Sequence, residues 1–103
     1  MFRNEVHIEG IVKRDSEAAH PRPNVSVMSF CLAVPDPMSE GADVYVDCFA
    51  ATEVVEQLDG FVSQGEALAV DGQLSFRTMT DYKGRRRSAM VVCVKNVEEI
   101  EER

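Results

Sequence analysis

Four cations stand within five residues of this sequence, and their types suit them to phosphate binding. The basic cluster consists of Lys83, Arg85, Arg86 and Arg87. An arginine side chain can donate two parallel hydrogen bonds to one phosphate, and a lysine adds a compact positive charge. A run of charges is also typical of a solvated loop that binds nothing. Other features of the chain have to decide between these two interpretations.

Histidine and cysteine, which often do chemistry in proteins, form no recognisable catalytic or metal-binding pattern here. His7-x-Glu9 is similar to the first half of a zinc deaminase signature, but the Pro-Cys-x-x-Cys half is absent. Cys31, Cys48 and Cys93 are widely spaced, which argues against a zinc knuckle and a dithiol motif. We interpret these thiols as small buried hydrophobes. We therefore expect no enzyme activity, no cofactor or metal and no small-molecule substrate.

The composition is that of an ordinary folded domain. The 103 residues suffice for one domain, and hydrophobic and charged residues make up 45% and 28% of them. No apolar run approaches the roughly 20 residues that span a membrane. Glu5 interrupts the N-terminal stretch where a signal peptide needs continuous apolar residues. We therefore expect a cytoplasmic protein without membrane contact.

The net charge of −7 at first argues against a nucleic-acid partner. The charges are unevenly distributed, however, because four glutamates gather near the C-terminus, at Glu98, Glu99, Glu101 and Glu102. The basic cluster is one sharply positive segment in an acidic chain. Such a segment can still meet a polyanion locally, although the acidic remainder weakens long-range attraction.

Alternation of side-chain types predicts five strands, over residues 4–14, 25–34, 43–51, 67–80 and 88–97. Proline-containing stretches at 15–24 and 35–42 predict loops. Thr52 is a candidate N-cap for a short helix that ends near Gly65. Its apolar face consists of Val54, Leu58, Phe61 and Val62. We expect one domain over residues 1–98 and an acidic tail over residues 99–103.

The order of these elements is three strands, one short helix and two strands. The OB-fold has this order, because it is a five-stranded Greek-key barrel with its helix between the third and fourth strands. We therefore predict an all-β, five-stranded OB-fold barrel. The basic cluster then lies in the hairpin that joins the last two strands.

Several segments of the chain resemble the bacterial single-stranded-DNA-binding proteins. They are Asn4-x-Val6-x-Ile8-x-Gly10, Phe30-x-Leu32-Ala33-Val34, Gly65-Glu66, Val70-Asp71-Gly72-Gln73-Leu74 with Arg77, Asp81-Tyr82-Lys83-Gly84 and Val91–Val97. The resemblance extends from residue 4 to about residue 98, so it covers nearly the whole chain. No segment is specific alone, but their order and spacing together are.

The resemblance implies a homo-oligomer, a tetramer or a dimer, that coats single-stranded DNA during replication, recombination and repair. Such proteins hold phosphates in a basic groove and stack bases on aromatic side chains. The stacking positions of the family fall on Tyr45, Ala51 and Met79, and a loop alignment adds Met38. Only Tyr45 among these four has a ring, and the chain has no tryptophan. Phe76 and Tyr82 can compensate if they point outward.

The candidate nucleic-acid-binding residues combine these positions with cations along the chain. They are Arg3, Lys13, Arg14, Met38, Tyr45, Arg77, Met79, Lys83, Arg85, Arg86 and Arg87. Arg77 either binds phosphate in the groove or forms a structural ion pair. The same two interpretations apply to Arg3, Lys13 and Arg14. Tyr45 is either a stacking ring or part of the core.

Two functions of different classes fit these observations. The first is sequence-independent binding of single-stranded DNA, which the basic cluster and the strand segments favour. The alternative is an OB-fold protein-interaction or regulatory subunit, a primosomal protein or a paralogue of the single-stranded-DNA-binding proteins, that binds DNA weakly. The scarcity of aromatic residues and the net charge of −7 favour this alternative.

Overall fold

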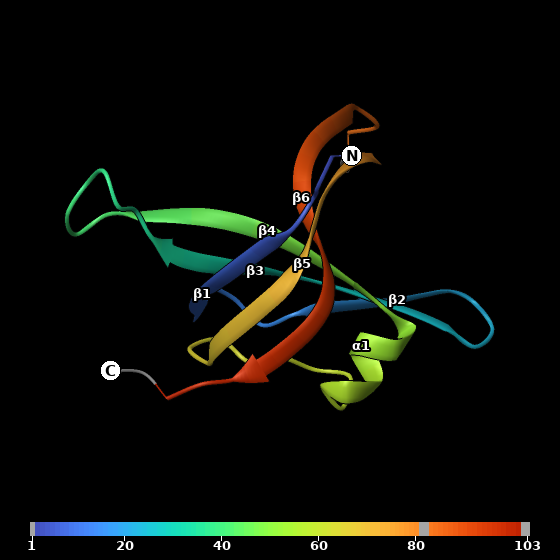
Figure 1. Ribbon diagram of the computed structural model, residues 1–103. Coiled ribbons are helices and arrows are strands. Elements are labelled where there is room, and N and C mark those ends of the chain that lie inside the picture. Colours follow the sequence, from blue (N-terminus) through green and yellow to red (C-terminus); the bar gives the residue numbers. More distant parts are fainter. Residues whose placement is uncertain (1, 81–82, 102–103) are drawn as a thin grey trace.

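The computed structural model describes residues 2–80 and 83–101, apart from the side chains of residues 79 and 80. Six strands and one helix follow one another along the described chain (Figure 1). They are β1 (Val6–Val12), β2 (Glu17–Arg22), β3 (Val25–Pro35), β4 (Asp43–Ala51), α1 (Thr52–Gln57), β5 (Ala67–Thr80) and β6 (Arg86–Glu99).

Five of these strands pair in a closed ring. Along the ring β1 pairs with β5, β5 with β6, β6 with β4 and β4 with β3, and β3 returns to β1. Only the β4–β6 pairing is parallel among these. The closing pairs are Ile11 with Ala33 and Val12 with Leu32. With α1 between β4 and β5, this arrangement confirms the predicted OB-fold.

Two glycines allow the strands of the ring to approach closely. A Cβ atom at Gly10 would lie 2.5 Å from the carbonyl oxygen of Ala33, on the strand that closes the ring. A Cβ atom at Gly72 would overlap the carbonyl of Cys93, where the β5–β6 register shifts. Neither position has room for a side chain.

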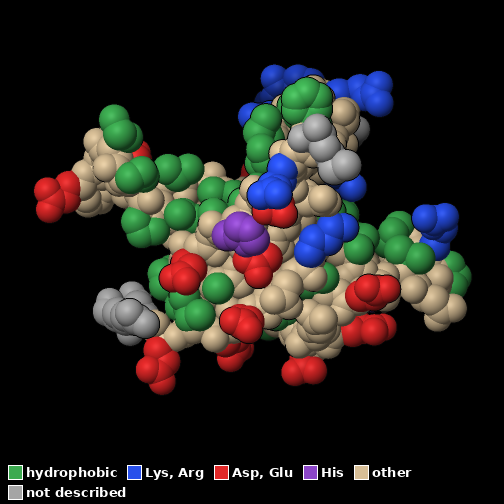
Figure 2. Space-filling model, viewed as in Figure 1, with side chains coloured by type: hydrophobic (Ala, Val, Ile, Leu, Met, Phe, Trp, Pro, Cys, Tyr) green, Lys and Arg blue, Asp and Glu red, His purple; other side chains and the backbone are tan. Residues whose placement is uncertain are grey.

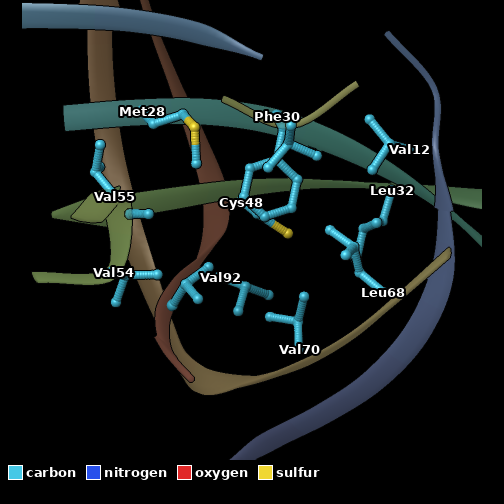
Figure 3. Packing of buried hydrophobic residues seen from close by; sticks show 13 residues of the cluster. Val12, Met28, Phe30, Leu32, Cys48, Val54, Val55, Leu68, Val70 and Val92 are labelled. Carbon is cyan, nitrogen blue, oxygen red and sulfur yellow. The ribbon is translucent and has the colours of Figure 1, made fainter. Parts of the chain in front are cut away.

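The core fills the ring with side chains from every strand of the ring and from α1. Met28, Phe30 and Leu32 of β3 are at most 5% exposed, and they alternate with residues on the outer face. Val54 and Val55 of α1 point into the same cluster near Met28 (Figure 3). The short helix therefore closes one end of the ring with its apolar side.

The predicted loop at 15–24 is wrong over most of its length, because it contains β2. This strand pairs with β3 from Glu17 opposite Ser29 to Arg22 opposite Val25. All six of its residues are exposed, so no buried face produces an alternation that the sequence could reveal. Pro21 is tolerated because β2 is an edge strand with an irregular register.

The helix is shorter than predicted and has a different cap. It ends at Gln57, and Phe61 is 52% exposed instead of lying on a buried helical face. Thr52 is the first helical residue and Ala51 the N-cap, which has no side-chain hydrogen bond. The Thr52 hydroxyl bonds instead to the backbone of Ser26, accepting from N–H at 3.0 Å and donating to C=O at 3.2 Å. Thr52 therefore ties the helix to β3.

Candidate nucleic-acid interface

The outer face of β4 presents two aromatic rings with a carboxylate between them. Cys48 and Ala50 point into the core, so the alternate positions Tyr45, Asp47 and Phe49 point outward. Tyr45 is 59% exposed, which decides for the surface and against the core. Of these three outward residues, Tyr45 and Asp47 are exposed and Phe49 is half-buried.

A cation lies over each of these rings. The Nζ atom of Lys13 is 4.8 Å from the centroid of the Tyr45 ring and donates to its hydroxyl at 3.4 Å. The Cζ atom of Arg77 is 3.8 Å from the centroid of the Phe49 ring. Cation–π attraction keeps positive charge at the rings. A ring with an adjacent cation offers a base a stacking surface and its phosphate a counter-charge.

A groove of about 350 Å³ runs beside Phe49 and Asp47. Arg14 and Arg77 also line it, and its floor includes Cys31. The β3 residues opposite Tyr45, Asp47 and Phe49 are small, namely Ala33, Cys31 and Ser29. Small side chains beside large outward ones leave a depression along the β3–β4 pair. The shape suits an extended chain, and the two arginines lie in the groove beside the carboxylates of Asp15, Glu17 and Asp47.

The thiols near this groove are poor nucleophiles. Burial raises the pKa of Cys48 to about 12. Burial, followed by the negative charge of Asp47, also raises the pKa of Cys31. All three cysteines are free. Within the described part of the chain, no group of three His, Cys, Asp or Glu residues is arranged to hold a metal ion.

The basic cluster lies at the far end of the β5–β6 hairpin, where the two strands extend beyond the ring. Lys83, Arg85, Arg86 and Arg87 are all exposed. Figure 2 shows Lys and Arg side chains gathered at the upper end of this hairpin, whereas Asp and Glu are spread over the lower body. Met79 pairs with Arg87 in register, but its side chain lies outside the described part of the structure. Tyr82 lies outside it entirely.

Two of the predicted site residues stand apart from the groove. The guanidinium of Arg3 lies 4.0 Å from the Glu5 carboxylate, an exposed pair on the N-terminal segment. Met38 is 91% exposed in the β3–β4 loop, where its N–H donates to Asp36 at 2.9 Å. This loop projects away from the β5–β6 hairpin (Figure 1). Lys13, Arg14, Tyr45 and Arg77, by contrast, gather along one face of the ring.

Phe49 is the principal candidate site residue that sequence reasoning missed. The family alignment assigns the second stacking position of this strand to Ala51, which has no ring. Phe49 shares the outward phase of Tyr45 and Ala51, and that phase together with its ring is the signal in the sequence that points to it. Its contact with Arg77 depends on the packing of β5 beside β4 in the folded ring, and no local pattern in the sequence reveals that packing.

A second exposed surface lies on the β5–β6 hairpin. Leu74, Phe76 and Met90 form an apolar strip, with exposed fractions of 48%, 64% and 61%. Phe76 and Met90 are direct cross-strand neighbours. Phe76 therefore points outward, as a ring that compensates for the missing stacking positions has to, but no ring–cation pair involves it in the described structure.

Among the described residues, no helix is long and apolar enough to cross a membrane.

Comparison with known proteins agrees with this geometry. The model of the single-strand binding protein family matches residues 3–100. The single-stranded DNA-binding protein of Halalkalibacterium halodurans is 28% identical over 97% of this chain and 62% of its own length. The one from Borreliella burgdorferi is 25% identical over 92% of this chain and 68% of its own length. The chain thus spans less than two thirds of the first of these relatives.

A solved structure shows the same fold. The Plasmodium falciparum SSB in complex with ssDNA superposes with a TM-score of 0.79 at 13% identity. The superposition covers 98% of this chain and 97% of the other. Similarity at this level of identity speaks for the fold alone, whereas the family model matches the sequence itself over nearly its full length. This chain belongs to the single-strand binding protein family, whose members bind rather than catalyse.

Proposed function

We propose that this chain binds single-stranded DNA without reading its sequence, as part of replication, recombination and repair. The observation that carries the proposal is the outer face of β4, where Tyr45 and Phe49 each lie beside a cation. Stacking on aromatic rings tolerates every base, because every base has a π-face. The names of the relatives and of the superposed complex support the same ligand.

The proposed binding mode divides the ligand between rings and cations. Bases stack at Tyr45 and at the Phe49–Arg77 pair, while phosphates contact Lys13, Arg14 and Arg77 on the same face. The DNA strand then continues toward the basic cluster at the end of the β5–β6 hairpin. Because Arg77 already lies on the Phe49 ring, it is positioned before the ligand arrives, and less side-chain entropy is lost on binding.

The direct test is a fluorescence-anisotropy titration of labelled oligo-dT at low and at moderate salt, with duplex DNA as a competitor. We expect submicromolar affinity at low salt, weaker binding at higher salt and little competition from the duplex. Affinity no better than micromolar at low salt would overturn the proposal. The label is necessary because the chain has no tryptophan to report binding.

One observation favours the alternative of a protein-interaction subunit, namely the apolar strip of Leu74, Phe76 and Met90. The same strip supports a homo-oligomer, a dimer or a tetramer, since association would bury it. Val6 and Ile8 of β1 pack against the core and offer no such surface. Light scattering that shows a monomer at high concentration would exclude the homo-oligomer. Micromolar or weaker DNA affinity together with a heterologous partner would favour the alternative.

We further propose a cytoplasmic location, because the matched curated relatives are bacterial DNA-binding proteins.

We also propose that residues 1–98 form the DNA-binding domain and that residues 99–103 form its acidic tail. The sheet reaches slightly into that tail, since β6 ends at Glu99 and the N–H of Ile100 donates to Ala67 at 3.0 Å.

A further inference from the structure

Asp47 is a carboxylate in the middle of the proposed DNA-binding face. It is exposed, lines the groove beside Phe49 and Arg77, and lies on β4 between the two rings. Within the described structure, its carboxylate forms no hydrogen bond or ion pair. Two other carboxylates line the same groove: Asp15, which accepts a hydrogen bond from the N–H of Gln64 at 2.8 Å, and Glu17, which lies on β2 opposite Ser29 and not between the rings. Asp47 is therefore an open acceptor where a polyanion is proposed to bind.

A carboxylate at this place determines which part of the ligand can approach it. Phosphates are repelled, so the sugar–phosphate chain has to follow the cations, and the bases turn toward Asp47. The rings at Tyr45 and Phe49 are about 13 Å apart along the strand at its normal rise per residue. Asp47 lies halfway between them, about 7 Å from the residue of each ring at the same rise. Cys31, directly opposite, is small and leaves room for the edge of a base.

An ionised carboxylate accepts hydrogen bonds and donates none. Guanine offers two adjacent donors on its pairing edge, N1–H and the N2 amino group, which match the two carboxylate oxygens. Cytosine and adenine each offer an amino group next to a ring nitrogen that is itself an acceptor. Thymine offers one N–H between two carbonyl oxygens, and both of these repel the carboxylate. Single-stranded nucleic acids are read along such exposed edges.

We propose that Asp47 gives the groove a base preference, with guanine favoured, cytosine and adenine intermediate and thymine disfavoured. The inference rests on the proposed function and refines it. Stacking supplies most of the affinity for any sequence, and Asp47 adds a modest bias. Asp47 is then a specificity residue that acts on the base edge directly.

The test compares three labelled oligonucleotides of equal length, namely oligo-dT, alternating thymine–guanine and alternating thymine–hypoxanthine. Hypoxanthine has the ring system of guanine without the N2 amino group, so the last two oligonucleotides differ chiefly in one donor. For the unmodified protein we expect guanine to bind about fivefold more tightly than hypoxanthine. The oligo-dT is expected to bind most weakly.

The variant Asp47→Asn should abolish the difference between guanine and hypoxanthine and strengthen binding to oligo-dT. The matched control is Asp59→Asn, which removes the same charge from an exposed turn after α1. Asparagine tolerates the positive φ of 54° at that position. The control should keep the guanine preference. An unchanged preference in Asp47→Asn overturns the inference, whereas failure of all three oligonucleotides to bind the unmodified protein overturns the proposed function instead.

Discussion

The outer face of β4 and the end of the β5–β6 hairpin provide two different kinds of contact. On β4, each ring lies beside a cation, at 4.8 Å for Tyr45 and 3.8 Å for Phe49, and a groove lies next to them. At the hairpin end, four exposed cations stand together, and no ring is described among them. The first region can stack bases, and the described cations of the second can neutralise phosphates.

Because of this difference, DNA binding by the two regions should depend on salt concentration to different degrees. Stacking and cation–π contacts depend little on ionic strength, whereas contacts between mobile cations and phosphates weaken as counterions compete. The β4 face should therefore provide the part of the affinity that survives at moderate salt. The basic cluster should provide the steep salt dependence. The four predictions below test this division, starting with the largest expected effect.

The substitution Gly72→Ala should remove both regions together. Its Cβ atom would overlap the carbonyl of Cys93 at the base of the hairpin, so the β5–β6 pairing has to open. We expect the free energy of unfolding to fall by at least about 2 kcal/mol. Urea denaturation followed by far-UV circular dichroism measures it. The control Gly41→Ala meets no atom within 4 Å and has only its positive φ to strain it, so it should cost about 1 kcal/mol. Equal losses in the two variants would contradict the close approach at Gly72.

Neutralising Arg85, Arg86 and Arg87 together with glutamine should weaken binding to oligo-dT about tenfold or more at low salt. The slope of log affinity against log salt should become shallower by about 0.7 for each lost phosphate contact. Anisotropy titrations over a salt series give both quantities. The control Arg22→Gln removes an exposed cation from the separate β2–β3 hairpin and should leave the slope unchanged. If the triple variant keeps its affinity and slope, the basic cluster is only a solvated loop.

The substitution Phe49→Ala should weaken binding by about 1–3 kcal/mol, the range for one stacked base. Its salt slope should change little, because no phosphate contact is removed directly. The same anisotropy series measures both. Phe61→Ala removes another exposed ring, one that does not line the groove, and serves as the control. A shallower slope without loss of affinity at moderate salt would show that Phe49 only positions Arg77.

Much of the fold follows from alternation in the sequence. The outward phase of β4 is already visible where Tyr45 and Asp47 alternate with Val46 and Cys48. β2 is invisible for a physical reason: with both faces in water, its pairing with β3 imposes no pattern on the side chains. The length of the helix was also predicted wrongly, because the apolar residues after Gln57 continue the helical spacing without being helical.

Less of the site could be predicted, because it depends on contacts between distant residues. Lys83 to Arg87 are adjacent in sequence, so their charge can be read directly. The pair of Arg77 and Phe49 joins β5 to β4, and the pair of Lys13 and Tyr45 joins the end of β1 to β4. No local spacing records such pairs. The family alignment places a stacking position at Ala51, and Phe49, two residues earlier on the same face of β4, carries the ring.

The smallest expected effect concerns a residue pair outside the two proposed DNA-binding regions. His7 on β1 pairs with Asp71 on β5 at 2.8 Å, on an exposed part of the sheet. Its hydrogen bond to Asp71 raises the pKa of His7 above 6.5, and the same bond lowers the pKa of Asp71 below 3.8. A raised histidine pKa stabilises the fold below 6.5, and that contribution is lost as the pH rises through the folded value. The Asp71 contribution is present above 3.8 and is lost as the pH falls through its lowered value.

The stability advantage of the unmodified protein over His7→Gln should therefore be largest at mildly acidic pH and shrink from about pH 6 to pH 8. Urea denaturation at several pH values measures this advantage. Asp71→Asn should show the same loss of pH dependence, because either substitution removes the charged pair. Parallel pH profiles for His7→Gln and the unmodified protein would rule out the linkage. Binding to oligo-dT at fixed pH should be unchanged in His7→Gln, and a loss of affinity would place part of the DNA path on the β1–β5 surface instead of β4 and the hairpin end.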